Sequence, residues 1–219
     1  MVRVGSRTLQ VMATVHDVAA ALIGGQTAAG RTIDKMQLQK LLYLVQGGNL
    51  ARTSRPAFTA TIRAYKYGPV VTEVEDTYRS VVSGTSPIER PLGGDPARLD
   101  PATVEVVADV LAAFGEFTGP NLEKFTKKPR SPWHLARPGL DPGAPSRNPI
   151  DVNDIADWFA EHPLDPNGSS VYAPTRDVDL DALASAPVGG PSDEAVCWDA
   201  EDVVDGGYVI DRSKFMIIS

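Results

Sequence analysis

Cysteine and histidine are scarce in this chain of 219 residues. Cys197 is its single cysteine, which excludes an internal disulfide framework and a thiolate metal cluster. The three histidines, His16, His134 and His162, lie far apart and follow none of the common zinc-ligand spacings. We therefore expect no transition-metal site.

Sequence signatures of catalysis are also missing. Gly24-Gly25 and Gly189-Gly190-Pro191 lack the Lys and the Ser or Thr of a phosphate-binding loop. Cys197 lies beside Trp198 in an acidic stretch, which favours a packed, unreactive thiol over a nucleophile. The sequence thus predicts a protein that is not an enzyme and uses no cofactor.

Long apolar runs are absent as well. No stretch approaches the roughly 18 consecutive apolar residues that a membrane-spanning helix needs. The first residues, Met-Val-Arg-Val-Gly-Ser-Arg, have no apolar signal core. We expect a soluble cytoplasmic protein without a membrane partner.

Charge is present but unevenly distributed, with a net charge of −7. Residues 1–60 carry seven Lys or Arg against two Asp or Glu, whereas residues 151–219 carry three against fifteen. The acidic end favours a basic partner or a basic face of the same chain, and it argues against nucleic-acid binding by that part. Asp179 and Asp181 lack the spacing of an EF-hand, so a solvated acidic surface explains them better than a divalent-cation site.

The clearest helical pattern lies at residues 32–46. Leu38, Leu41, Leu42 and Val45 fall at i, i+3, i+4 and i+7 and predict one buried face, with Leu44 widening it. Asp34 is the predicted N-cap, with Gln37 closing a capping box. The side chains expected to lie off the buried face are Gln37, Gln39, Lys40 and Gln46. Gly47-Gly48 either end this helix or admit a close neighbour.

The remaining patterns predict a mainly α fold: a domain of about six helices (residues 1–163) with a small antiparallel β component. Further helices are expected at residues 15–22, stopped by Gly24-Gly25, then from Pro69 or from a later start near Thr72, and at 101–114, 119–125, 132–136 and 152–159. Residues 58–64 alternate as a strand with one buried face. Residues 164–219 form an irregular, β-prone, acidic extension, in which Asp205-Gly206-Gly207 indicates a hairpin.

Residues 65–69, Tyr-Lys-Tyr-Gly-Pro, form the most unusual short run. A structural interpretation is a sharp corner between strand and helix, in which Gly68 supplies a permissive backbone and Pro69 fixes φ. A functional interpretation is a partner-binding corner, because tyrosine beside basic residues is common in interface hot spots. Both interpretations remain open at this point.

Two motifs of this sequence resemble motifs of a known family and occur in the same order. Residues 36–46, Met-Gln-Leu-Gln-Lys-Leu-Leu-Tyr-Leu-Val-Gln, resemble the "KLQKLLYYAQ" helix of the Panacea antitoxin domain, also called SocA-like. Residues 64–70, Ala-Tyr-Lys-Tyr-Gly-Pro-Val, resemble its "AWKYGPV" motif, and the spacing between the two also matches. Ser131-Pro132-Trp133 and Asn148-Pro149-Ile150, with the helix after it, resemble later family motifs, so that the resemblance covers about residues 14–160. The chain departs from the family at Gly47-Gly48 and in its acidic extension.

The resemblance implies a mostly helical, non-enzymatic antitoxin of a prokaryotic or phage toxin–antitoxin system. Such proteins bind and neutralise a cognate toxin directly, and the acidic extension suggests that this toxin is basic. An alternative is a proteolysis adaptor or regulatory interaction module, which one relative in the family exemplifies. The residues expected to bind the partner are Tyr65, Lys66, Tyr67, Trp133, Trp198 and Tyr208.

Overall fold

The computed structural model describes residues 13–83, 85–164, 203–204 and 208–209. Those ranges contain seven α-helices and two antiparallel strand pairs, which confirms the mainly α fold with a small β component. The helices are α1 (Val15–Ala28), α2 (Lys35–Thr53), α3 (Thr72–Arg79), α4 (Pro101–Phe114), α5 (Gly119–Thr126), α6 (Pro132–Leu135) and α7 (Val152–Glu161), with a short 3-10 helix η1 (Pro96–Arg98) before α4. The strands are β1 (Ile62–Tyr65), β2 (Gly68–Val71), β3 (Val203–Val204) and β4 (Tyr208–Val209).

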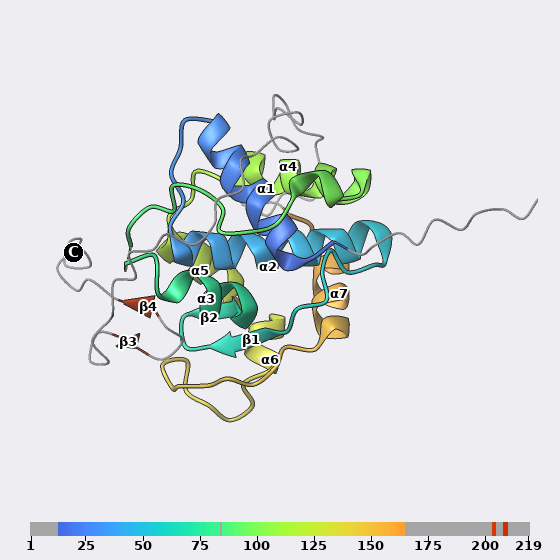
Figure 1. Ribbon diagram of the computed structural model, residues 1–219. Coiled ribbons are helices and arrows are strands. Elements are labelled where there is room, and N and C mark those ends of the chain that lie inside the picture. The colour runs from blue at the N-terminus through green and yellow to red at the C-terminus, as the bar shows by residue number, and fades with distance from the viewer. Residues whose placement is uncertain (1–12, 84, 165–202, 205–207, 210–219) are drawn as a thin grey trace, which may run out of the picture.

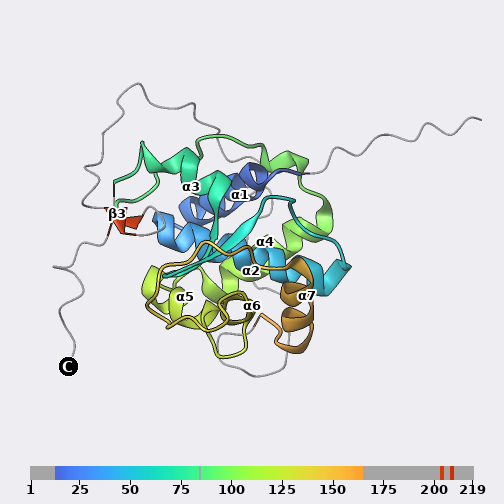
Figure 2. The same cartoon turned by 90° about the horizontal axis from the view of Figure 1, so that it is seen from below.

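Helix α2 runs through the middle of the molecule (Figure 1). It contacts α1, α3, α4, α5, α7 and β2, so that nearly every element packs on it. Seen from below, α5, α6 and α7 follow one another along one side of α2 while the β1–β2 hairpin crosses it (Figure 2). Within the described residues, no helix combines the length and the apolar composition that crossing a membrane requires.

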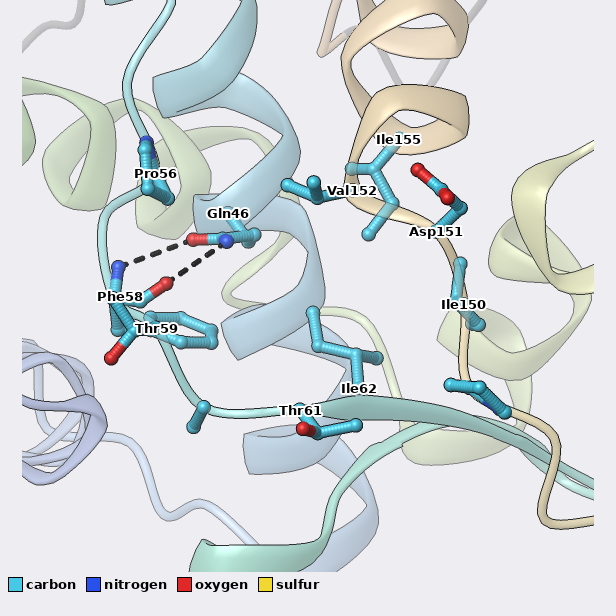
Figure 3. A pocket seen from close by; sticks show the side chains of 12 residues that line it. Gln46, Pro56, Phe58, Thr59, Thr61, Ile62, Ile150, Asp151, Val152 and Ile155 are labelled. Atoms are coloured by element: carbon cyan, nitrogen blue, oxygen red, sulfur yellow. Dashed lines mark hydrogen bonds between the residues drawn. The ribbon is translucent and has the colours of Figure 1, made fainter.

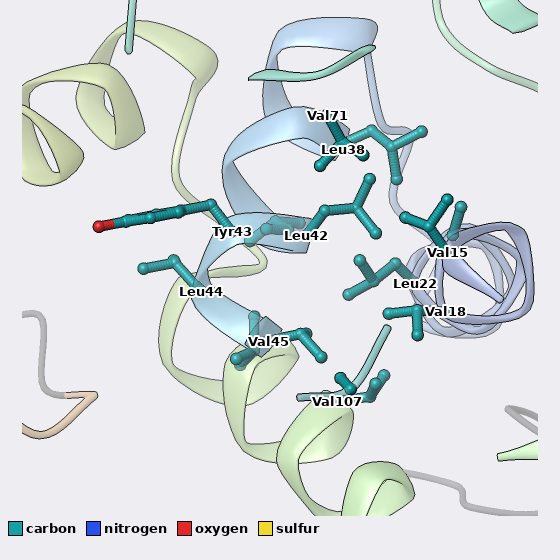
Figure 4. Close-up of a cluster of buried hydrophobic side chains, with 14 of the residues drawn as sticks. Val15, Val18, Leu22, Leu38, Leu42, Tyr43, Leu44, Val45, Val71 and Val107 are labelled. Carbon is teal, nitrogen blue, oxygen red and sulfur yellow. The ribbon is translucent and has the colours of Figure 1, made fainter. Parts of the chain in front are cut away.

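The apolar face predicted for α2 is confirmed, because Leu38, Leu41, Leu42, Leu44 and Val45 are all buried. Figure 4 shows leucine and valine side chains of α2 and α1 interdigitating, while Tyr43 and Leu44 point away from α1 to the opposite side of the helix. The helix is therefore buried all round rather than on one face.

The polar face predicted for α2 is wrong for three of its four members. Gln39, Lys40 and Gln46 are buried, and Gln37 is half-buried. Helical periodicity identifies which side chains share a face, but it does not show that a second layer of structure covers the polar side. That second layer is the β1–β2 hairpin and the chain leading into it.

Gly47 and Gly48 admit close neighbours and do not end the helix, which continues to Thr53. A Cβ atom at Gly47 would overlap the ring of Phe159, and one at Gly48 would overlap the side chain of Leu164. The two glycines thus let α7 and the chain after it lie directly on the backbone of α2.

Three predicted element boundaries are wrong. Helix α1 continues through Gly24-Gly25 to Ala28, because this part of the helix is buried and packing outweighs the roughly 1 kcal/mol by which each helical glycine is disfavoured. Pro69 lies in β2 and not in a helix, since it pairs with Ala64 in the hairpin, and α3 starts at Thr72, the later start that the sequence allowed. The strand begins at Ile62 and not at residue 58, because pairing partners for its backbone begin only there.

Other predicted features are confirmed. Asp34 and Gln37 form the reciprocal capping box predicted at α2. The starts expected near residues 101, 132 and 152 are also present, where Asp100, Ser131 and Asp151 cap α4, α6 and α7. The hairpin expected around Asp205-Gly206-Gly207 is present as β3 paired with β4, with Val204 opposite Tyr208. The other β-prone pieces predicted after residue 164, including the stretch that contains Trp198, lie outside the described residues.

Candidate functional site

The Tyr65–Pro69 run forms the turn of the β1–β2 hairpin. Tyr65 pairs with Gly68 and Ala64 pairs with Pro69, which leaves Lys66 and Tyr67 as the two turn residues. Gly68 has a φ of +98°, a left-handed conformation that glycine adopts without steric cost. A Cβ at Gly68 would also lie 3.0 Å from Cε of Lys40, so both backbone conformation and space favour glycine here.

Four side chains hold the hairpin through its carbonyl oxygens, two from helices α2 and α6 and two from the residues just after α5 and α6. Trp133 Nε1 of α6 donates to the Tyr65 carbonyl at 2.7 Å, and Lys40 Nζ of α2 donates to that of Pro69 at 3.0 Å. Two further donors are Arg137 Nη1 to the Ala64 carbonyl at 3.0 Å and Lys127 Nζ to the Lys66 carbonyl at 2.9 Å. Residues 148–150 pair with part of the outer edge of β1, where the Ala64 N–H donates to the Asn148 carbonyl, and the side-chain donors bind further carbonyl oxygens of the hairpin.

Trp133 is the centre of this arrangement. Its buried ring lies between two cations, with Lys127 Nζ and Arg137 Cζ each 4.7 Å from the ring centroid. Such cation–π contacts are worth about 0.5–2 kcal/mol, more when solvent is excluded. The indole therefore positions both the hairpin and two of the basic side chains that hold it.

Buried charge lies beneath the hairpin. Burial lowers the pKa of Lys40 to about 7, with Glu123 opposing the shift. Burial raises the pKa of Glu75 on α3 to about 7, although Lys35 and Arg79 favour its ionised form. Burial also lowers the pKa of Lys35. The pKa values of Lys40 and Glu75 therefore both lie close to neutral pH.

The structure places the predicted partner-binding residues in different environments. Tyr65 and Trp133 have only 4% and 3% of their surfaces exposed, so in this structure their rings serve the core of the molecule. Lys66 and Tyr67 are half-buried at the turn, with Lys66 Nζ 5.1 Å from the Tyr67 ring centroid. The partner-binding role of these residues therefore stays a prediction. Lys66 and Tyr67 are the two whose exposed parts a partner can contact directly.

The two predictions in the C-terminal extension have less structural context. Tyr208 belongs to β4, where its backbone pairs with Val204. Trp198 lies outside the described residues.

The residues that sequence reasoning missed are Gln39 and Lys40, which were expected to lie off the buried face of α2 and are buried. Both belong to the motif at residues 36–46. Lys40 binds the backbone of Pro69 in the other motif, residues 64–70, and Gln39 binds the backbone of Val71, which directly follows it. The regular distance between the two motifs was the signal that could have paired them.

An open groove lies beside the hairpin (Figure 3). It has a volume of about 540 Å³ and separates residues 56–62 from residues 149–155. Gln46 lies at its inner side and exchanges hydrogen bonds with the backbone of Phe58, at 3.1 and 3.3 Å. The hairpin and this groove are the two surface features that the buried polar side chains of α2 support.

The fold and this site define a helical protein that is built around one enclosed helix and presents an anchored β-hairpin. Residues 38–134 match the family model described as Antitoxin SocA-like, Panacea domain. The match includes residues 38–46 of the first motif, all of the second motif and the Ser131-Pro132-Trp133 turn, and it confirms the resemblance predicted from them. Comparisons with curated proteins and with solved structures each gave no match.

Proposed function

We propose that this chain is an antitoxin that neutralises a cognate toxin protein by binding it directly. The observation that carries the proposal is the family match over residues 38–134, which contains α2 from Leu38 onward, the hairpin and the Trp133 anchor. Neutralisation in this proposal is occlusion through a protein–protein interface, without catalysis or a cofactor. The match supports an antitoxin role, and the direct binding mechanism is the part that needs an experiment.

The anchored hairpin supports a binding role on physical grounds. A rigid surface loses little conformational entropy when it binds, and the hairpin is held by donors from α2, from α6 and from Lys127, which directly follows α5. Lys66 and Tyr67 lie at its exposed turn, where a partner can reach them. The acidic composition of residues 165–219 would speed association with a basic toxin.

Growth of cells that express the product of the adjacent gene tests the proposal. We expect that product to stop growth alone and growth to recover when this chain is co-expressed. If no adjacent gene product is toxic, or if co-expression leaves toxicity unchanged, the proposal is wrong. The abundance of the toxin separates direct inhibition from the adaptor alternative, because an adaptor lowers that abundance whereas an inhibitor leaves it unchanged.

A further inference from the structure

The groove beside the hairpin is lined mainly by apolar side chains, including those of Phe58, Ala60, Ile62, Ile150, Val152 and Ile155. Val152 lies at its open side, where 44% of the residue is exposed (Figure 3). Open apolar grooves of this kind bind peptide segments, either as an added strand or as a helix. The backbone along one wall distinguishes between these two kinds of segment.

That wall is an extended segment whose backbone is hydrogen-bonded at Phe58 and Ile62 and, among the described residues, at none of the three positions between them. Exposure alternates along it, with Phe58 and Ile62 buried and Thr59 and Thr61 exposed, as in a strand. The backbone of Phe58 is bound by Gln46, and the carbonyl of Ile62 accepts from the backbone N–H of Ile150 at 2.9 Å.

Ala60 lies between these two positions. Among the described residues, neither its backbone N–H nor its carbonyl takes part in a hydrogen bond. Because backbone groups alternate along an extended chain, those of Ala60 face the same side as those of Phe58 and Ile62. The wall therefore offers a donor and an acceptor in the geometry that an added strand uses.

The charge at the groove is negative. Asp151 is the charged residue among those that line it. The helix that follows carries Asp154, Asp157 and Glu161 and has no Lys or Arg between Val152 and Glu161. A segment that carries a basic side chain is complementary to this wall, whereas an acidic one is repelled.

We propose that this groove binds an extended, apolar segment of the cognate toxin that carries Lys or Arg, paired as an added strand with Ala60. This inference rests on the proposed antitoxin function and names the surface and the partner segment that the function would use. The apolar side chains of the segment fill the space between Phe58 and Val152, and its basic side chain faces Asp151.

Calorimetric titration of the purified full-length chain with the purified toxin encoded by the adjacent gene tests this proposal. Val152→Trp fills the groove and should weaken binding by about tenfold or more, as for a central interface position. Leu140→Trp is the matched control, because Leu140 has a similar exposed fraction, 41%, outside the groove and should bind as the unaltered chain does.

A second pair of variants tests the charge. Asp151→Asn keeps a side chain that can cap α7 and should weaken binding by about threefold, an effect that added salt reduces. Asp157→Asn removes an exposed carboxylate of the same helix that does not line the groove, and binding should stay unchanged.

Amide hydrogen exchange tests the proposed strand pairing. The Ala60 amide should exchange rapidly in the free chain and slowly in the complex.

The outcomes are distinguishable. A tight complex that Val152→Trp leaves unchanged overturns this inference but not the proposed function. The absence of any complex with the unaltered chain overturns both.

A segment of the chain itself has the chemistry proposed for the toxin segment, since the apolar residues 215–218 follow Arg212 and Lys214. Slow exchange at Ala60 in the free chain that becomes rapid with Ile217→Asp would mean that the chain occupies its own groove, which also overturns the proposal.

Discussion

Gln39 and Val71 exchange two hydrogen bonds through one side-chain amide. Val71 donates its backbone N–H to Gln39 Oε1 at 2.7 Å, and Gln39 Nε2 donates to the Val71 carbonyl at 3.2 Å. Both residues are buried. A side chain of the central helix thereby satisfies the end of β2 as a neighbouring strand would.

Gln39→Met tests this contact because it keeps the side-chain volume and removes both hydrogen bonds. The two backbone groups of Val71 would be left buried without partners, which costs about 1–3 kcal/mol for each group. We expect the free energy of unfolding, measured by urea denaturation, to fall by about 2–6 kcal/mol. Asn121→Met, at an exposed position on α5, should change it by less than about 0.5 kcal/mol. An equally small effect for Gln39→Met would contradict the role assigned to this contact.

Gly47→Ala should destabilise the protein, although a Gly→Ala change inside a helix ordinarily stabilises it by about 1 kcal/mol. The added methyl group would overlap the ring of Phe159, so we expect a net loss of about 1–3 kcal/mol. The double variant with Phe159→Leu should lose less than the two single changes combined. Gly143→Ala, where a Cβ meets no neighbour within 4 Å, is the control in thermal unfolding. Additive losses in the double variant would refute the steric explanation.

Stability should depend on pH through Glu75. Burial raises the pKa of this carboxyl from 4.5 to about 7, so the folded protein holds a proton that the unfolded chain releases. The free energy of unfolding therefore falls as the pH rises from about 4.5 to about 7, by up to about 3 kcal/mol at 1.4 kcal/mol per pKa unit, and then changes no further from this group. Lys40, with its pKa lowered to about 7, adds stability as the pH rises from about 7 towards 10.5.

Urea denaturation at pH 5, 6, 7 and 8 checks this dependence. Glu75→Gln should remove the decrease between pH 5 and 7, so its difference from the unaltered chain should change steadily over that range. Glu89→Gln, at an exposed position, should follow the unaltered chain. Parallel curves for the Glu75 variant and the unaltered chain would show that the carboxyl does not titrate in this way.

Tyr67→Ala tests the exposed turn of the hairpin as part of the toxin interface. Because Tyr67 is only half-buried and lies at the turn, the free energy of unfolding should fall by less than about 1 kcal/mol. Toxin neutralisation, measured as recovered growth across a range of antitoxin expression, should require about tenfold more protein if the ring is an interface hot spot. Thr77→Ala on α3 is a control of similar exposure. Neutralisation that is unchanged in the Tyr67 variant would remove the turn from the interface.

The sequence predicts the α-helical elements well because caps and apolar spacing are local signals. Asp34 with Gln37 and Asp100 with Pro101 mark helix starts that the structure reproduces. The alternation at residues 58–64 also predicts correctly which side chains face inward. Only the extent of the strand was wrong, because pairing depends on what lies beside the chain, and Gln46 rather than a strand binds Phe58.

The candidate site was less predictable because its important contacts join distant residues. Trp133 and the Tyr65 carbonyl are 68 positions apart, and no local pattern indicates that an indole will bind that oxygen. Lys40 presents the same difficulty, since a lysine on the polar side of an amphipathic helix ordinarily faces solvent. A buried polar side chain becomes recognisable only when its partner in the chain is known.

Direct measurement of complex formation between the purified chain and the toxin encoded by the adjacent gene tests the central claim most directly. We expect a stable complex in which toxin activity is lost in proportion to the antitoxin added, while the amount of intact toxin stays constant. The contradicting result is a toxin that remains fully active in the presence of excess antitoxin, or one that loses activity only when a cellular protease is present to degrade it.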